Sequence, residues 1–504
     1  MSPQASTAPP KQPQTLFGVL LESRSAWTAV IAFSLVINFL MLAPSIYMLQ
    51  VSDRVLTSRN MTTLAMISML AVAVFIGMGA LEWARSRILV RLGVRMDRRL
   101  GPQLLALSHR LGIEQNGGDS RRLLSDLTTV RTFLTGYGVL AMLDAPWVPI
   151  FFIVSLMLHP VLALVMLTGG LILVGLTLLT EKLTRKPLAR ANERGAEAAR
   201  FANVNLRSAE VIEAMGMLPV MAARWQERQD EHLTEQAKAS DRAGLISAAT
   251  RFIRTTNQCA AMGVGAYLTM DGQVSPGMMM AGSLLASRMI APIEMVISTW
   301  SMWGSAREAW GRIDEALATP EKAYSGVTLP RPKGEIVLEN LTGGAPRQKE
   351  PSVKNVSLKI PAGVSVAVVG ASASGKSSLM RMISGVWQPW DGVVRIDGAD
   401  QRHWRREDLG PHIGYMPQDV ELIEGTIAEN IARHGELDSD KIIAAARAAG
   451  MHDMILQLPD GYASQVGSYG GYLSGGQRQR LGLARALYGS PSVLILDEPN
   501  ANLD

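Results

Sequence analysis

Six apolar stretches of about twenty residues occupy the first 300 residues of this 504-residue chain. A helix rises 1.5 Å per residue and needs about 20 apolar residues to cross a hydrocarbon layer about 30 Å thick. Residues 62–81 and 161–180 carry no charged side chain, which argues against a buried core of a soluble protein. The sequence therefore predicts an α-helical membrane domain with six spans, at residues 27–49, 62–81, 139–158, 161–180, 245–270 and 278–300.

Basic side chains gather in the two long connections between these stretches. Six arginines fall within residues 85–99, and lysines and arginines recur through 182–200. Connections of this kind stay on the cytoplasmic side of a membrane, so both termini are expected in the cytoplasm. Only 18% of the residues are charged and the formal net charge is +5. Basic loops of a multi-pass membrane protein explain that excess, and no nucleic-acid partner is expected.

Charged residues also interrupt the last two stretches. Arg251 and Arg254 stand near the start of residues 245–270, where their side chains can reach the cytoplasmic interface. Arg288 stands near the middle of the sixth stretch, and Glu294 is not on its helical face. Two interpretations of Arg288 remain open: it lines an aqueous path, or it makes a buried contact with a neighbouring span.

Composition divides the chain into parts. The first residues are mainly Pro, Gln, Ser and Ala, which is typical of a disordered tail. Prolines at 320, 330 and 332 mark a linker, and short β-rich runs alternating with polar helices follow it. We therefore expect a tail (1–15), a membrane domain (16–318), a linker (319–333) and an α/β domain (334–504).

The α/β domain should open with three strands. Residues 335–339 and 356–360 have the pattern of strands, and residues 364–369 are nearly all apolar, which predicts a buried strand.

The string GASASGKS begins directly after that third run and precedes the helical run 378–384. It has the form GxxxxGK[ST], in which a curled backbone points successive N–H groups at phosphate oxygens. The lysine then reaches the β and γ phosphates and the serine hydroxyl reaches Mg²⁺. The sequence predicts an ATP and Mg²⁺ site that contains Gly370, Ala371, Ser372, Ala373, Ser374, Gly375, Lys376, Ser377 and Ser378.

A second acidic element suits the same site. The apolar run 492–496 ends in Asp497 and Glu498. An aspartate at the end of such a strand provides the second protein contact to Mg²⁺. The neighbouring glutamate can orient the attacking water or accept its proton, which makes Glu498 the predicted catalytic base.

A third element lies between the other two. Ser474, Gly475, Gly476 and Gln477 open a polar helix, where free N–H groups and a hydroxyl can bind phosphate. One chain has no need of two phosphate-binding elements about a hundred residues apart, but two facing chains do. The sequence therefore predicts a dimer in which each ATP lies between Lys376 of one chain and Ser474 of the other. Because this chain carries all the motifs, a homodimer is expected, and pairing with a related half-transporter stays open.

With these motifs the chain resembles an ABC transporter over nearly its whole length. Gln418 matches the Q-loop of that family, which implies contact with Mg²⁺ and with the attacking water. Residues 502–504 match the start of the D-loop. The strings DAPWVP from Asp144, QDVELIEGTIAEN from Gln418 and DEPNANLD from Asp497 resemble bacterial type I secretion exporters of metalloproteases, lipases and RTX proteins.

This resemblance implies ATP-driven export of an unfolded or partly folded protein across the bacterial inner membrane. It also implies a periplasmic adaptor, an outer-membrane channel and contact with membrane lipids. Two alternatives stay open: an exporter of lipids or drug-like molecules, and a membrane protein regulated by nucleotide without pumping.

Three departures from the family pattern carry expectations of their own. In the family the switch histidine follows a further strand, and no histidine here stands in that place. The resemblance therefore implies an ABC nucleotide-binding domain that is truncated at its C-terminus, and we expect the 504-residue chain to bind ATP but to hydrolyse it poorly. No aromatic residue lies between Leu341 and Pro351 to stack on adenine, so base selectivity is expected to be loose. Residues 467–470 carry no acid, which leaves the usual coupling contact before the serine-glycine segment without a candidate.

Overall fold

The computed structural model describes residues 15–115, 122–318, 329–346, 348–467 and 470–500. It divides into two compact units, residues 1–106 with 122–318, and residues 107–121 with 319–504. Most of the predicted tail and the first part of the predicted linker lie outside the described residues.

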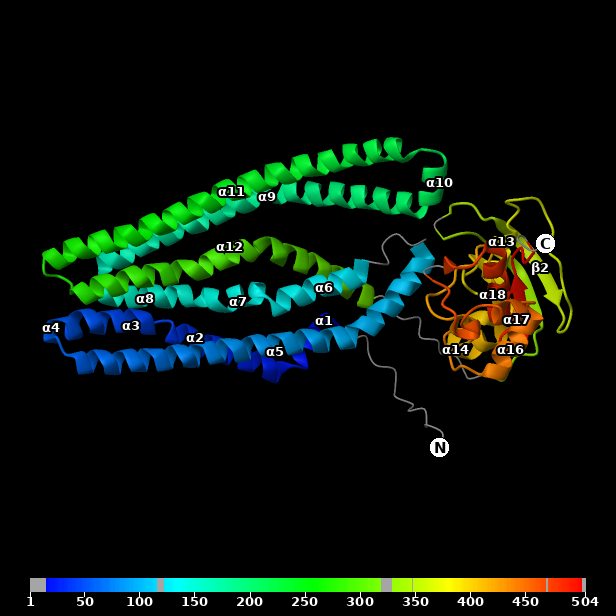
Figure 1. Ribbon diagram of the computed structural model, residues 1–504, viewed down its shortest axis with the longest axis horizontal. Helices are drawn as coiled ribbons and strands as arrows, with labels where there is room; N and C mark the ends of the chain where they lie inside the picture. The colour runs from blue at the N-terminus through cyan, green and yellow to red at the C-terminus, as the bar shows by residue number, and fades with distance from the viewer. Residues whose placement is uncertain (1–14, 116–121, 319–328, 347, 468–469, 501–504) are drawn as a thin grey trace, which may run out of the picture. The chain divides into compact units, whose positions relative to one another are not determined.

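The first unit is helical, and its long helices run beside one another (Figure 1). Helix α11 packs along α9, and α12 packs against α3, α6, α7, α8 and α9. Its helices are α1 (Leu16–Leu21), α2 (Arg24–Leu40), α3 (Ala43–Gln50), α4 (Leu56–Ser58), α5 (Met61–Gln115), α6 (Arg122–Thr135), α7 (Tyr137–Asp144), α8 (Val148–Leu158), α9 (Pro160–Arg207), α10 (Ala209–Ala214), α11 (Leu218–Met270) and α12 (Pro276–Ala318).

Four helical stretches of the described chain are long and apolar enough to cross a membrane: Arg24–Ser58, Met61–Ile113, Tyr137–Leu158 and Pro276–Ala318. The segment Pro160–Leu176 is apolar but shorter. The predicted spans 161–180 and 245–270 fall within α9 and α11, so all six predicted stretches are helical. The count of six membrane crossings stays a prediction.

Prolines break two of the predicted spans. The first is interrupted after Leu40, because Pro44 cannot donate a backbone hydrogen bond and its ring crowds the carbonyl four residues earlier. The third contains a 3₁₀ turn, Ala145–Trp147, at Pro146. At each break the structure has two helices where the sequence predicts one continuous span.

A buried polar cluster joins α2, α5 and α7. The Asp144 carboxylate accepts a hydrogen bond from Asn38 Nδ2 at 2.7 Å and lies 3.5 Å from Arg85 Nη1. Arg85 Nη1 also donates to Ser34 Oγ at 3.0 Å. Arg85 and Asp144 are only 6% and 8% exposed, so this ion pair has little contact with solvent.

Asp53 caps the start of the long helix α12 from another part of the chain. It lies in a π-helical turn, Val51–Val55, and its carboxylate accepts hydrogen bonds from Ser275 Oγ and, at 2.7 Å, from the backbone N–H of Gly277. A carboxylate at a helix N-terminus accepts hydrogen bonds from the free N–H groups, and its negative charge is attracted to the positive end of the helix dipole. The cap therefore fixes the segment between α3 and α5 against α12.

An ion pair joins one charged residue of the fifth predicted span to one of the sixth. Arg254 Nη1 lies 2.9 Å from Glu294 Oε2, which joins α11 to α12. Sequence spacing relates Glu294 only to Arg288, on the same helix, and does not indicate a contact with Arg254. Arg288 is half-buried on α12, and both interpretations of it stay predictions.

The second unit has two sheets and six helices among its described residues. The antiparallel sheet has the order β2-β1-β3-β4, and a parallel pair joins β5 to β6. The strands are β1 (Ile336–Gly343), β2 (Val353–Ile360), β3 (Asp391–Ile396), β4 (Ala399–Asp400), β5 (Ile413–Met416) and β6 (Val493–Leu496). The helices are α13 (Lys376–Ile383), α14 (Arg406–Leu409), α15 (Ile427–Ile431), α16 (Ser439–Ala448), α17 (His452–Leu456) and α18 (Gly475–Leu487).

Two of the three predicted opening strands are confirmed, as β1 and β2. The prediction of a buried strand at 364–369 is wrong. No strand forms there, and Val364, Val366 and Val369 are 55%, 47% and 88% exposed. A strand needs neighbours to pair its backbone N–H and C=O groups. In the described chain β6 pairs only with β5, so this apolar run has no pairing partner.

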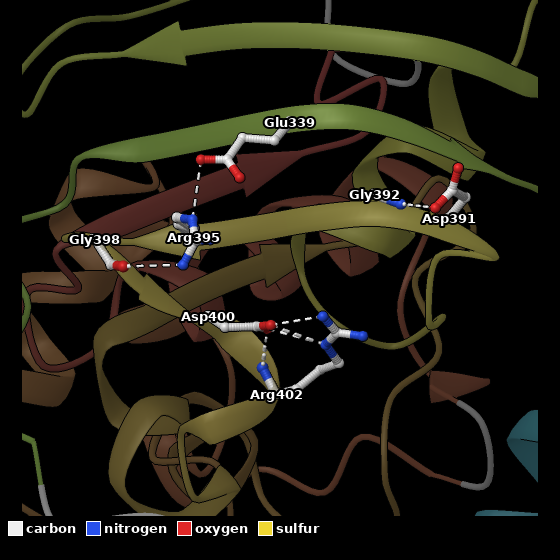
Figure 2. A network of polar contacts seen from close by, with 7 residues as sticks. All are labelled: Glu339, Asp391, Gly392, Arg395, Gly398, Asp400 and Arg402. Carbon is white, nitrogen blue, oxygen red and sulfur yellow. Dashed lines mark hydrogen bonds and ion pairs between the residues drawn. The ribbon is translucent and has the colours of Figure 1, made fainter.

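A polar network lies along the antiparallel sheet (Figure 2). Arg395 Nε on β3 lies 3.0 Å from Glu339 Oε1 on β1, and Asp400 accepts hydrogen bonds from Arg402. Burial raises the pKa of Asp400, but the hydrogen bonds and charge of Arg402 outweigh burial, so the pKa lies below its usual value. None of the site residues predicted from the sequence belongs to this network, which we interpret as support for the sheet.

Two hydrophobic cores anchor α13, which follows the predicted phosphate loop, and α18, which begins after Ser474. Leu379, Met382 and Ile383 of α13 pack against both sheets in the first core. Leu481 and Ala484 of α18 pack among α15, α16 and α17 in the second. The helix that follows the predicted phosphate loop and the helix that begins after Ser474 are therefore anchored in different cores.

Candidate nucleotide site

The predicted phosphate loop forms the turn that leads into α13. Ala373 and Gly375 have left-handed backbone conformations, with φ of 64° and 92°. A Cβ atom on Gly375 would lie 2.5 Å from the carbonyl oxygen of Ser352, so only glycine fits against the start of β2. The loop therefore has the tight curl that the motif requires.

Lys376 begins α13, two residues before the start of the predicted helical run 378–384, and its side chain folds back over the loop. Its Nζ donates to the carbonyl oxygens of Gly370 and Ala371, at 2.9 Å each. Ser377 and Ser378 follow in the first helical turn and are half-buried. The first N–H groups of a helix have no partner within it and carry partial positive charge, which suits an anion.

The parallel pair β5–β6 brings the predicted catalytic residues together. Met416 lies opposite Leu496, so both strands end at one edge, where Gln418 and Glu498 leave them. Gln418 Nε2 donates to Glu498 Oε2 at 2.9 Å. The sequence placed these residues eighty positions apart, and the parallel register explains why their side chains meet.

Asp497 directly follows β6 and is 4% exposed. Its backbone N–H donates to Met416 O at 3.0 Å, which continues the ladder by one residue. Burial raises the pKa of the Tyr415 phenol, and the negative charge of Asp497 adds to this rise, against a hydrogen bond from Arg381 of α13. Tyr415 therefore stands close to both the predicted Mg²⁺ ligand and the helix of the phosphate loop.

Ser474 caps α18, as predicted. Its Oγ accepts a hydrogen bond from Gln477 N at 3.3 Å, and Gln477 Oε1 accepts one from Ser474 N at 2.9 Å. This reciprocal capping box fixes the start of the helix. Gly475 and Gly476 occupy its first turn, where unpaired N–H groups point along the helix axis.

The hydrogen bonds and ion pairs of the described residues join some predicted site residues and not others. They join Lys376 to Gly370 and Ala371 within the phosphate loop, Gln418 to Glu498, and Ser474 to Gln477. None of them joins the phosphate loop to Asp497 or to Ser474. Residues 502–504, 468 and 469, to which the D-loop match and part of the missing-acid expectation refer, lie outside the described residues.

Two polar residues, one buried and one half-buried, were not predicted from the sequence. Gln479 on α18 is 3% exposed, and its Nε2 donates to the backbone carbonyl of Glu498 at 2.9 Å. Arg433 donates to backbone carbonyls at the end of α18 and beside β5. The only signal for Gln479 in the sequence is that this polar residue stands two positions before the apolar Leu481. The acceptors of Arg433 are Gly410 O at 2.9 Å, Arg485 O at 3.1 Å and Ala486 O at 3.1 Å.

These residues fit a nucleotide with Mg²⁺. The loop curl, the Lys376 ammonium and the first turn of α13 would provide donors for phosphate oxygens, and Ser377 and the buried Asp497 would provide oxygen ligands for the cation. In the described residues no group of three His, Cys, Asp or Glu side chains could hold a metal by itself.

The fold and the site define a membrane protein that carries a P-loop nucleotide-binding domain in the same chain. Family models support each half: the ABC transporter model matches residues 353–501, and the ABC transporter transmembrane region matches residues 27–293. The chain belongs to the ABC transporter family. It is a multi-pass membrane protein whose nucleotide-binding domain couples ATP hydrolysis to transport.

Individual relatives narrow the family. The chain is 41% identical over 487 residues to the type I secretion system ATP-binding protein PrsD of Rhizobium meliloti (strain 1021), covering 96% of this chain and 84% of that protein. It is 29% identical over 491 residues to the toxin RTX-I translocation ATP-binding protein of Actinobacillus pleuropneumoniae, covering 96% of this chain and 69% of that protein. The resemblance to type I secretion exporters is therefore confirmed.

A solved structure supports the fold. The structure of a bacterial Atm1-family ABC exporter with ATP bound matches with a TM-score of 0.79 and 22% identity, covering 95% of this chain and 86% of that chain. The predicted fusion of a helical membrane domain with an ABC nucleotide-binding domain is thereby confirmed.

Proposed function

We propose that this chain is the ATP-driven protein exporter of a type I secretion system. It works as a homodimer in the bacterial inner membrane, with both termini in the cytoplasm. A periplasmic adaptor and an outer-membrane channel complete the path, and the cargo is an unfolded or partly folded protein. Identity to a type I secretion protein over 96% of the chain supports the cargo class.

One observation carries the enzymatic part of the proposal: the contact between Gln418 and Glu498 at the edge of β5–β6, beside the buried Asp497. A carboxylate held in this place can orient a water molecule and accept its proton. The Gln418 amide holds one carboxylate oxygen and leaves the other free for that water.

Each remaining predicted residue has a distinct task. Bound ATP and Mg²⁺ would supply the transferable phosphoryl group and the cation that neutralises its charge. Lys376 and the N–H groups of residues 370–378 bind and orient the phosphates. Ser377, Asp497 and Gln418 would hold the cation. Ser474–Gln477 of the partner chain bind the same phosphates from the opposite side, so that closure of the site requires two chains.

Two substitutions in the full-length protein, purified in lipid nanodiscs, test this division of tasks. Lys376→Ala should weaken ATP binding strongly, because it removes the cation at the phosphates. Glu498→Gln should keep ATP binding and lower the hydrolysis rate about 10²–10⁴-fold. Lys354→Ala, an exposed lysine on β2, is the matched control and should behave as wild type. Equal hydrolysis by the wild type and by Glu498→Gln would contradict the proposed site.

A cross-link tests the dimer. Cys259 is the single cysteine, so Cys259→Ser gives a background without thiols. In that background Ala373→Cys and Ser474→Cys should cross-link between chains, and ATP should raise the yield in the presence of Glu498→Gln. A yield that ATP does not change would contradict the shared site.

A further inference from the structure

The Glu498 backbone has a disfavoured conformation. Its φ is +49°, in the left-handed region that residues with a Cβ rarely adopt. Pro499 follows, which restricts Glu498 further and provides no N–H group of its own. A conformation of this kind persists only where surrounding contacts hold it.

Two glutamines hold Glu498 at different atoms. Gln418 binds the carboxylate, and Gln479 Nε2 donates to the main-chain carbonyl at 2.9 Å. Glu498 is exposed, whereas Gln479 is 3% exposed and shares a helix face with the buried Gly482 and Ala486. The contact at the carbonyl is therefore the one that comes from a packed part of the domain.

Contacts hold the C-terminal end of helix α18 in place. Arg433 donates to carbonyls of its last turn, and a Cβ on Gly414 of β5 would lie 2.3 Å from Ala486 O. Arg485 Nη1 donates to Glu421 O, three residues beyond Gln418. A shift of α18 must therefore change its contacts with β5 and with the segment after Gln418.

The near end of α18 is the capped segment Ser474–Gln477, and Gln479 lies five residues after Ser474. At 1.5 Å per residue this is about 7.5 Å along the helix axis. One rigid helix thus carries both the residues that would contact the partner chain's nucleotide and the amide that holds this chain's catalytic glutamate.

We propose that Gln479 is a positioning residue for hydrolysis. It fixes the Glu498 backbone so that the carboxylate points at the attacking water, and it ties this orientation to the docking of α18 on the partner's nucleotide. Each site of the dimer is then competent when the other holds ATP. The inference rests on the proposed function, in which Glu498 is the base and Ser474 acts across the dimer.

The test replaces the amide without shortening the side chain. In the full-length protein in nanodiscs, Gln479→Met should lower kcat about tenfold. The Kd for ATP should stay within twofold of wild type, and the apparent Tm within about 2 °C. Gln457→Met, the same change at an exposed position of this domain, is the control and should not lower kcat.

A second readout does not depend on turnover. In the thiol-free background with Ala373→Cys and Ser474→Cys, Gln479→Met should leave the ATP-dependent cross-link yield unchanged when Glu498→Gln is present. Gln479→Met should also lower kcat no further in the Glu498→Gln protein, because it acts through that carboxylate. A purely structural role would instead lower the cross-link yield, the ATP affinity or both.

The outcomes separate the two claims. Wild-type kcat in Gln479→Met, or a further loss in the Glu498→Gln background, overturns the inference and leaves the proposed function intact. Equal hydrolysis in wild type and Glu498→Gln overturns the proposed function itself. If methionine lowers the Tm, Gln479→Asn repeats the test, because it keeps the polar amide but is one methylene too short to reach the carbonyl.

Discussion

The Arg85–Asp144 pair allows a quantitative test of how the membrane domain is held together. At the observed 3.5 Å and an effective dielectric constant of about 20, the two charges attract by about 5 kcal/mol. Removing both from water costs a similar amount, so the pair as a whole contributes little net stability. Removing one partner is different, because the other charge stays buried without compensation.

Asp144→Asn keeps an oxygen acceptor for Asn38 and removes only the charge. We expect it to lower the free energy of unfolding by about 3–5 kcal/mol, and Arg85→Met to do the same. The double variant should lie within about 1 kcal/mol of wild type, which gives a coupling energy of several kcal/mol. The measurement is SDS-induced unfolding of the protein in mixed micelles, compared across the four proteins of the cycle.

Glu22→Gln serves as the matched control. Glu22 pairs with Arg99 near α1, where both side chains are more than 40% exposed, and exposed pairs are worth about 0–1 kcal/mol. Additive losses in the Arg85 and Asp144 double variant would refute the reasoning, because they would show that the two side chains stabilise the fold independently.

Three further predictions concern other positions. Arg433→Met should lower the free energy of unfolding of the nucleotide-binding unit by about 3 kcal/mol, because it removes the donor for several partly buried carbonyls; an unchanged Tm would contradict this. Burial and the nearby charge of Arg331 lower the pKa of His412, so protonation favours the unfolded state and stability should fall as pH drops below about 6.5. His412→Gln should flatten that decline in Tm between about pH 7.5 and 5.5, and an identical pH profile would count against the assignment. Asp53→Asn should destabilise the cap on α12 by about 1 kcal/mol, measured by the SDS unfolding assay, and no change would show that the charge is dispensable there.

Local patterns predicted the parts of the site that depend on neighbours in the sequence. The phosphate loop, its helix and the serine cap of α18 follow from glycine spacing and from N-cap chemistry, and the structure has each of them. The strand before Asp497 also follows from its short apolar run.

Contacts between distant residues were not predictable in the same way. The bond between Gln418 and Glu498 depends on the parallel register of β5 and β6, which no local pattern encodes. Gln479 and Arg433 act through backbone carbonyls, which have no sequence signature in the partner. The run 364–369 shows the opposite error, since apolar character alone predicted a strand where the described chain offers no pairing neighbour.

The central claim is that ATP use by this chain exports protein. The most direct measurement compares the culture-medium proteome of the parent organism carrying the wild-type gene, Lys376→Ala, or the control Lys354→Ala. The account predicts that one or a few proteins without N-terminal signal peptides disappear from the medium only in Lys376→Ala. An unchanged medium under inducing conditions would contradict protein export and favour a lipid or drug-like substrate.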